Sequence, residues 1–137
     1  MVELTKIHPQ AWKDTTAQLV KIVSDIIKMK DFEEGTRSQA AEVVLTLGSQ
    51  SPATLRKLQE AKDVFFPALV QMLAEVEEDN DTWAETVDGE DGTGNDVHSA
   101  AISALGRFSL DMKQEFVLAA SKQVFGEGLG HADWKIR

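Results

Sequence analysis

Residues 36–48 read Thr-Arg-Ser-Gln-Ala-Ala-Glu-Val-Val-Leu-Thr-Leu-Gly, and this stretch decides the fold of the chain. Its apolar residues recur at steps of three and four, at Ala40, Val43, Val44 and Leu47. Such spacing places the four side chains on one face of a helix. Threonine is a favoured N-cap residue, so we expect this helix to run from about Thr36 to Leu47.

Helical periodicity also dominates on both sides of this stretch. We expect a first helix over about 10–29, a third over about 58–76, a fourth that begins near Asp96, and a fifth over about 111–125. Residues 132–137 read as the start of a sixth helix. The sequence therefore predicts an all-α protein without strands.

Proline and glycine residues mark where these helices bend and stop. Pro52 fits the first position of a short helix, because its missing N–H costs nothing there. Pro67 falls inside the third helix and should kink it. We expect Gly126, Gly128 and Gly130 to end the fifth helix.

The helices form pairs, and the pairs resemble each other. Leu47-Gly48 and Leu105-Gly106 lie 58 residues apart. Without an acidic insertion of roughly 18 residues, about 40 residues remain, which is the period of a two-helix HEAT repeat. We therefore expect a HEAT-repeat solenoid of about two and a half repeats, and part of a longer one. The first pair would cover 1–52, the second 53–110 with its insertion at about 77–95, and a third would begin over 111–137.

Composition excludes several classes of function. The chain has no cysteine, so it contains no disulfide, thiolate zinc site or cysteine nucleophile. No apolar run is long enough to cross a membrane. The histidines His8, His98 and His131 lack the spacing of metal ligands, and no nucleophile and base stand together. We expect no enzyme activity, no catalytic residue, no cofactor and no metal.

The formal net charge of −9 is concentrated in one segment. Residues 63–106 hold eleven of the 23 acidic residues and no Lys or Arg, which leaves 12 acidic against 14 basic residues elsewhere. An acidic surface repels nucleic acid and speeds encounter with a basic protein. The predicted partner-binding residues are Glu77, Glu78, Asp79, Asp81, Trp83, Glu85, Asp88, Glu90, Asp91 and Asp96.

Two other interpretations of the insertion stay open. It could be a solvated loop that only keeps the protein soluble. It could also bind calcium, but no start position gives the EF-hand its glycine at position six and glutamate at position twelve. Trp83 could be an exposed recognition residue or could pack back onto the helices.

Several stretches together carry a family resemblance. They are the helix over 36–47, the block Phe-Pro-Ala-Leu-Val-Gln-Met-Leu over 66–73, the acidic insertion, Ser-Ala-Leu-Gly-Arg over 103–107, and Asp-Trp-Lys-Ile-Arg over 133–137. An acidic segment with an embedded tryptophan, followed by that closing motif, is absent from ordinary HEAT repeats. The pattern resembles the importin-beta (karyopherin-beta) nuclear transport receptors, most closely their beta-3 branch.

The resemblance implies a receptor that moves between cytoplasm and nucleus. It would carry cargo proteins with basic signals, release them on binding the GTP form of the GTPase Ran, and contact phenylalanine-glycine nucleoporins along its outer helices. Arg37, Trp134 and Arg137 are predicted to be structural residues at repeat junctions. Trp134 would pack between repeats, and the two arginines would tie carboxylates or helix ends of neighbouring repeats.

The sequence also departs from the family pattern. Gly106 and Ile102 stand where the family tends to have Asp and Glu, and Lys113-Gln114 replace a glycine pair. The loss of these carboxylates argues against direct contact with basic cargo on this helix. Two other functions therefore remain possible at this stage: a HEAT scaffold of another system, such as a phosphatase or cullin regulator, or a free-standing acidic helical protein that binds calcium or histones.

Overall fold

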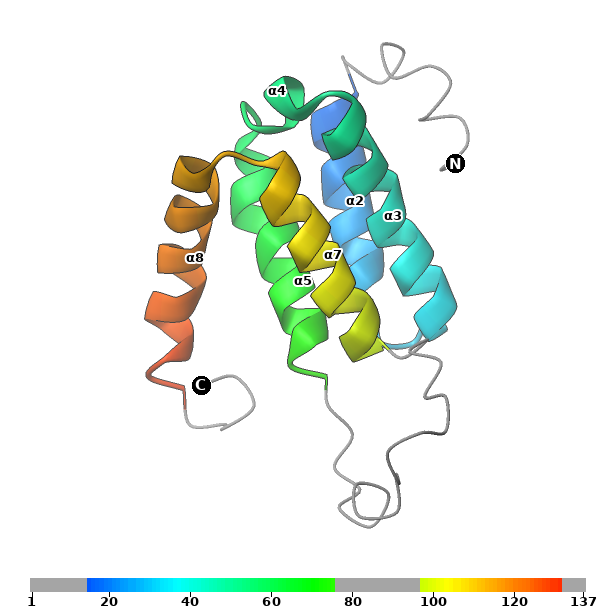
Figure 1. Ribbon diagram of the computed structural model, residues 1–137. Coiled ribbons are helices and arrows are strands. Elements are labelled where there is room, and N and C mark those ends of the chain that lie inside the picture. Colours follow the sequence, from blue (N-terminus) through cyan, green and yellow to red (C-terminus); the bar gives the residue numbers. More distant parts are fainter. Residues whose placement is uncertain (1–14, 76–96, 132–137) are drawn as a thin grey trace, which may run out of the picture.

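The structure is a computed structural model that describes residues 15–75 and 97–131 (Figure 1). Within these residues the secondary structure is helical, without a strand. The elements are α2 (Thr16–Lys28), α3 (Glu34–Gln50), α4 (Pro52–Leu55), the π-helical turn η2 (Ala61–Phe65), α5 (Phe66–Leu73), α7 (Val97–Asp111) and α8 (Gln114–Gly128). The predicted all-α class is confirmed.

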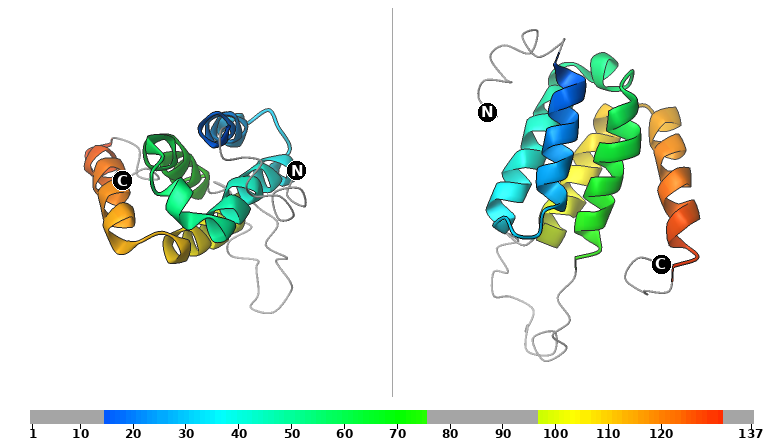
Figure 2. Two further views of the ribbon diagram at one scale, coloured as in Figure 1. Left: turned by 90° about the horizontal axis from the view of Figure 1, so that it is seen from above. Right: turned by 180° about the vertical axis from the view of Figure 1, so that it is seen from behind.

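The helices lie in two layers. One layer contains α2, the η2–α5 segment and α8, and the other contains α3 and α7 (Figure 2). Helix α2 packs on α3, and α5 packs on α7, while α3 and α7 contact each other across the pairs. Helix α8 contacts α5 and η2 within its own layer. The result is a stack of helix pairs in which each pair packs against the next.

The core lies between the two layers and joins the pairs. The predicted apolar stripe of α3 is buried, and so are Val97, Ala101, Ala104 and Phe108 of α7. The Phe108 ring is the hub: its centroid lies 5.4 Å from that of Phe65, 6.2 Å from that of Phe66 and 5.9 Å from that of Phe116. Tilted and edge-on aromatic pairs at such distances are favourable. One side chain thus connects α7 with η2, α5 and α8.

Several predicted helix boundaries were wrong. Helix α3 begins at Glu34, so Thr36 lies in the first turn, where its N–H bonds the carbonyl of Glu33. The fifth helix begins at Gln114 instead of Asp111, which ends α7. It also continues through Gly126 to Gly128. A single glycine costs a helix only about 1 kcal/mol, so one glycine does not end it.

The third predicted helix is continuous up to Leu73, but it widens into a π-helical turn just before its proline. Pro67 lies in the first turn of α5, where a missing N–H is tolerated. The carbonyl four residues earlier, on Asp63, cannot receive a normal helical hydrogen bond from a proline. The wider η2 turn, Ala61–Phe65, occupies this place. Pro52, by contrast, begins the short helix α4, as the sequence predicted.

None of the helices within the described ranges combines the length and the apolar character needed to cross a membrane.

Candidate functional site

Arg37 joins three helices at one end of the bundle. It projects from the first turn of α3 and is buried. Its Nε donates to the backbone carbonyl of Ile27 at 2.7 Å, in the last turn of α2. Its Nη1 and Nη2 donate to Glu75 Oε2 and Oε1 at 2.8 and 2.7 Å. Glu75 follows α5, so one guanidinium holds two helix ends and the start of a third helix.

This ion pair is shielded from water. The Arg37 side chain is 4% exposed and that of Glu75 is 17% exposed. Two parallel N–H···O bonds match the planar guanidinium to the carboxylate and make the strongest common type of protein ion pair. A buried charge without a partner is costly, so each residue requires the other. Arg37, which was predicted as a junction residue, therefore lies where the two helix pairs meet.

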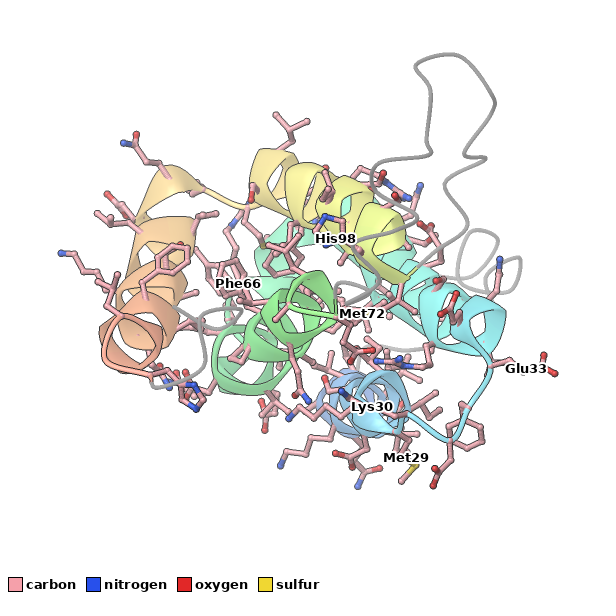
Figure 3. The ribbon with its side chains drawn as sticks, turned by 90° about the horizontal axis from the view of Figure 1, so that it is seen from below. Met29, Lys30, Glu33, Phe66, Met72 and His98 are labelled. Atoms are coloured by element: carbon pink, nitrogen blue, oxygen red, sulfur yellow. The ribbon has the colours of Figure 1, made fainter. Side chains whose placement is uncertain are left out.

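A second contact lies where the chain re-enters the bundle after the insertion, at the start of α7. Nδ1 of His98, in the first turn of α7, is 2.7 Å from the carbonyl oxygen of Leu73, the last residue of α5. Figure 3 looks at this end of the molecule, with His98 on α7, Met72 on α5 and the α2–α3 connection at Met29, Lys30 and Glu33. Glu75 and His98 thus fix both edges of the insertion to the same end of the bundle.

The predicted partner-binding residues lie outside the described part of the chain. These are Glu77, Glu78, Asp79, Asp81, Trp83, Glu85, Asp88, Glu90, Asp91 and Asp96, together with the predicted junction residues Trp134 and Arg137. The helices position only the two edges of the insertion, at Glu75 and Val97. The predicted role of the carboxylates therefore stays a prediction.

Two further ion pairs connect helices at the surface. Lys21 Nζ on α2 lies 3.3 Å from Glu60 Oε1, just before η2. A hydrogen bond from its own backbone amide and a second one from Lys21 lower the pKa of Glu60. Glu42 on α3 accepts a hydrogen bond from Arg107 on α7, and this bond raises the pKa of Arg107. Both pairs cross between successive helix pairs.

The opposite end of the bundle is tied together through Asp111, at the end of α7. Ser49 Oγ on α3 donates to Asp111 Oδ2 at 2.6 Å. Arg56 Nη1, just after α4, donates to the Asp111 carbonyl oxygen at 3.3 Å. These bonds hold the α3–α4 corner against the end of α7.

The surface of α7 carries the departures from the family pattern. Ile102 and Gly106 are both exposed, and Arg107 beside them is paired with Glu42. The exposed face of α7 therefore has no carboxylate with which to meet a basic peptide. Lys113 and Gln114 are also exposed, at the start of α8.

Residues 15–75 and 97–131 contain no group of three or more His, Asp or Glu residues that could hold a metal ion. His8 lies outside these ranges, and His98 has the structural contact with Leu73 described above. The arrangement fixes helices relative to one another and offers no assembled acid–base or nucleophilic site among the residues that the structure describes.

The sequence interpretation missed the role of Glu75, which it counted as part of the acidic segment. Its carboxylate belongs to the Arg37 pair instead. A signal was available, because Glu75 directly follows the apolar stripe of its helix and precedes the dense acidic run. His98 was likewise considered only as a metal ligand.

Comparison with known proteins identifies the family. Residues 29–119 match the sequence profile described as Importin repeat. The chain is 24% identical over 139 residues to importin subunit beta-3 of Saccharomyces cerevisiae, and the match covers 100% of this chain and 13% of that protein.

Solved structures agree with this match. Kap121p bound to RanGTP superposes with a TM-score of 0.88 at 24% identity, over 98% of this chain and 14% of that one. Kap121p bound to Nup53p gives a TM-score of 0.87 at 25% identity, over 98% of this chain and 13% of that one. The HEAT-solenoid fold and the resemblance seen in the sequence are confirmed. The chain belongs to the importin repeat family.

Proposed function

We propose that this chain is one stretch of a nuclear import receptor that binds basic cargo and the GTPase Ran through its HEAT solenoid. The observation that carries the proposal is the match of its whole length to importin subunit beta-3. Because the chain spans 13% of that relative, the activity belongs to the longer receptor and this stretch contributes to it. The receptor acts by binding, without a catalytic step.

The named partners of the relatives support this choice of partners. Kap121p has been solved bound to RanGTP and bound to Nup53p. For this chain we propose that the carboxylates of the insertion at 77–95 meet the basic partner. Eight acidic residues without a Lys or Arg raise the local negative potential, which attracts a cationic surface and speeds encounter. The Arg37–Glu75 and His98–Leu73 contacts fix where the insertion leaves the bundle.

The exposed surface of α7 favours the insertion over α7 itself as the place where the basic partner binds. Its exposed positions Ile102 and Gly106 carry no charge, and the Arg107 charge is compensated by Glu42. A basic segment would find no counter-charge along this face. The same receptor would contact phenylalanine-glycine nucleoporins along outer helices and shuttle between cytoplasm and nucleus.

The test uses the longer receptor that contains this stretch. A fluorescent lysine-rich peptide should bind it, and Ran loaded with a non-hydrolysable GTP analogue should displace that peptide. Ran loaded with GDP should not displace it, and a peptide with the lysines replaced by alanine should not bind. A receptor that binds neither the basic peptide nor GTP-loaded Ran in fluorescence anisotropy would overturn the proposed function.

A further inference from the structure

One serine ties the ends of α3 and α7 together. Ser49 lies in the last turn of α3 and is exposed to solvent. Its Oγ donates to Oδ2 of Asp111, the last residue of α7, at 2.6 Å. The same Oγ is 3.2 Å from the Leu45 carbonyl oxygen. Because a hydroxyl has one proton, the shorter bond to the charged acceptor is the stronger of the two.

The Ser49–Asp111 bond lies where negative charge already collects. The C-terminal ends of α3 and α7 meet here, and the free carbonyl groups at a helix C-terminus carry partial negative charge. The Asp111 carboxylate adds a full charge. Two arginines at this corner are already engaged: Arg56 Nη1 donates to the Asp111 carbonyl at 3.3 Å, and Arg107 is bonded to Glu42. A further negative charge at Ser49 would draw on cations that other groups already use.

The segment after Ser49 can open without exposing the core. From Ser49 to Thr54 every side chain is exposed or half-buried, and the buried residues on either side of the segment are Leu47 and Leu55. Helix α4, which follows, is four residues long. Segments that bury little apolar surface open locally at a low free energy. Residues 49–54 can therefore adopt the extended form that an enzyme acting on a peptide requires.

The residue that follows each serine indicates the class of enzyme. Residues 49–52 read Ser-Gln-Ser-Pro. Some protein kinases select a glutamine directly after the serine, and others select a proline there. Ser49 precedes the glutamine and is exposed, whereas Ser51 precedes the proline and is half-buried as the N-cap residue of α4. Exposure favours Ser49 as the acceptor.

We propose that Ser49 is a phosphorylation site for a glutamine-directed serine kinase, and that its phosphate releases the α3–α4 corner from the end of α7. The kinase transfers the γ-phosphoryl group of ATP: the bond between Ser49 Oγ and phosphorus forms, the bond from phosphorus to the β,γ-bridging oxygen breaks, and ADP leaves. The hydroxyl proton passes to the catalytic aspartate of the kinase. The proposal goes beyond the proposed transport function and does not depend on it.

The phosphate reverses the chemistry of the contact. A phosphoserine carries a charge of about −1.5 to −2 at pH 7 and has lost the proton that Ser49 donates to Asp111. At a helix C-terminus and beside a carboxylate, such a group acts by repulsion. The Ser49–Asp111 bond is lost, and the phosphate draws Arg56 away from the Asp111 carbonyl. Both bonds between this corner and α7 are thereby weakened.

Phosphorylation of the folded chain tests the site. The chain is incubated with ATP and a purified glutamine-directed kinase, and tandem mass spectrometry locates the phosphate. We expect it on Ser49, with no change in Ser51→Ala and none on Ser49 in Gln50→Ala. Ser38 is an internal control, because Gln39 follows it but its Oγ is buried, so it should accept phosphate only in the unfolded chain. An unmodified Ser49, or phosphate on Ser49 only after unfolding in urea, would overturn the proposal.

Charge variants test the effect on α7 without a kinase. Ser49→Asp should lower the Tm by about 5 °C, the shift that a tenfold loss in the folding equilibrium constant gives a domain of this size. Ser49→Asn adds no charge and should lower it much less. Gln50→Glu, which places the same charge on the next residue of the same turn, should also have a small effect.

A second substitution shows whether Asp111 is the group that repels the new charge. Asp111→Asn added to Ser49→Asp should recover most of the lost Tm, because it removes the facing carboxylate. The phosphorylated chain should unfold at least as early as Ser49→Asp. Equal Tm values for Ser49→Asp and Ser49→Asn, or a loss that Asp111→Asn does not relieve, would contradict the proposed release of α7.

Discussion

Arg37 and Glu75 lie 38 residues apart in the sequence, and their side chains form two hydrogen bonds. Arg37 Nη1 donates to Glu75 Oε2 at 2.8 Å, and Nη2 donates to Oε1 at 2.7 Å. The same guanidinium donates to the Ile27 carbonyl at 2.7 Å. Helix α3 is thereby fixed to the end of α2 in its own pair and to the end of α5 in the next pair. This contact sets how the first helix pair sits on the second, and where the acidic insertion begins.

Removing the carboxylate should destabilise the protein strongly. Glu75→Ala leaves the Arg37 guanidinium buried without a counter-charge, and we expect a loss of about 3 kcal/mol in the free energy of unfolding. Urea denaturation followed by circular dichroism measures it. The matched control is Glu42→Ala, which breaks the much more exposed pair with Arg107 and should cost less than about 1 kcal/mol. Equal losses for the two variants would contradict a dominant role for the buried pair.

Two glycines that look equivalent in the sequence should respond differently to substitution. A Cβ on Gly106 would meet no atom within 4 Å, whereas one on Gly48 would lie 3.4 Å from Leu55 Cδ2 and 3.5 Å from Met112 Cε. Gly106→Ala should stabilise the protein by about 1 kcal/mol, because alanine is the better helix former. Gly48→Ala should stabilise the protein less, because its added methyl group would contact Leu55 and Met112.

A larger side chain separates the two sites more clearly. Gly48→Leu should cost about 1–3 kcal/mol through overpacking, while Gly106→Leu should be neutral or stabilising. Thermal unfolding of the four variants measures this difference. Destabilisation by both leucine variants would show that α7 is covered at Gly106.

Local patterns explain why most of the fold could be predicted. The apolar stripes of α3 and α7 identify helices because their spacing is a property of a few consecutive residues. The start of α3 was misplaced because Thr36 is as compatible with a first turn as with a cap. The Leu-Gly pairs gave a useful repeat length, yet Gly48 is packed under Leu55 and Met112 while Gly106 faces solvent.

The site was less predictable because it depends on how the pairs stack. The sequence predicted a junction role for Arg37 without naming a partner, and Glu75 could be identified only once the layers placed the end of α5 beside the start of α3. The contact between His98 and Leu73 likewise requires that α7 return next to α5 after the insertion. Neither pairing leaves a periodic signal in the sequence.

The pKa of Glu60 should respond to the loss of its lysine. Lys21→Gln removes one of the two hydrogen bonds that hold this pKa below its ordinary value of 4.5, so the pKa should rise toward 4.5. It should stay slightly low, because the larger contribution comes from its own backbone amide. An NMR titration of the Glu60 carboxyl carbon measures the pKa in both proteins.

The same shift fixes the sign of a pH effect on stability. The pKa of Glu60 is lower in the folded protein than in the unfolded chain. The stabilisation that the ionised Glu60 carboxylate contributes is therefore present above about pH 4.5 and is lost as the pH falls through the folded pKa. Lys21→Gln should therefore reduce stability at neutral pH more than at pH below the folded pKa. An equal effect at both pH values would contradict the coupling.

The acidic insertion should act through charge and leave the helices unaffected. Replacing Asp79, Asp81, Asp88, Glu90 and Asp91 together by Asn or Gln removes five of the eight carboxylates in residues 77–95. In the longer receptor, this variant should bind a basic peptide or Ran more weakly at low salt. The difference from the unaltered receptor should shrink as salt rises, because exposed charges are screened within about 10 Å at 0.1 M.

Helix content by circular dichroism should not change, since the Arg37–Glu75 and His98–Leu73 contacts lie outside the replaced residues. Unchanged affinity for both partners at low salt would reduce the insertion to a solubility segment.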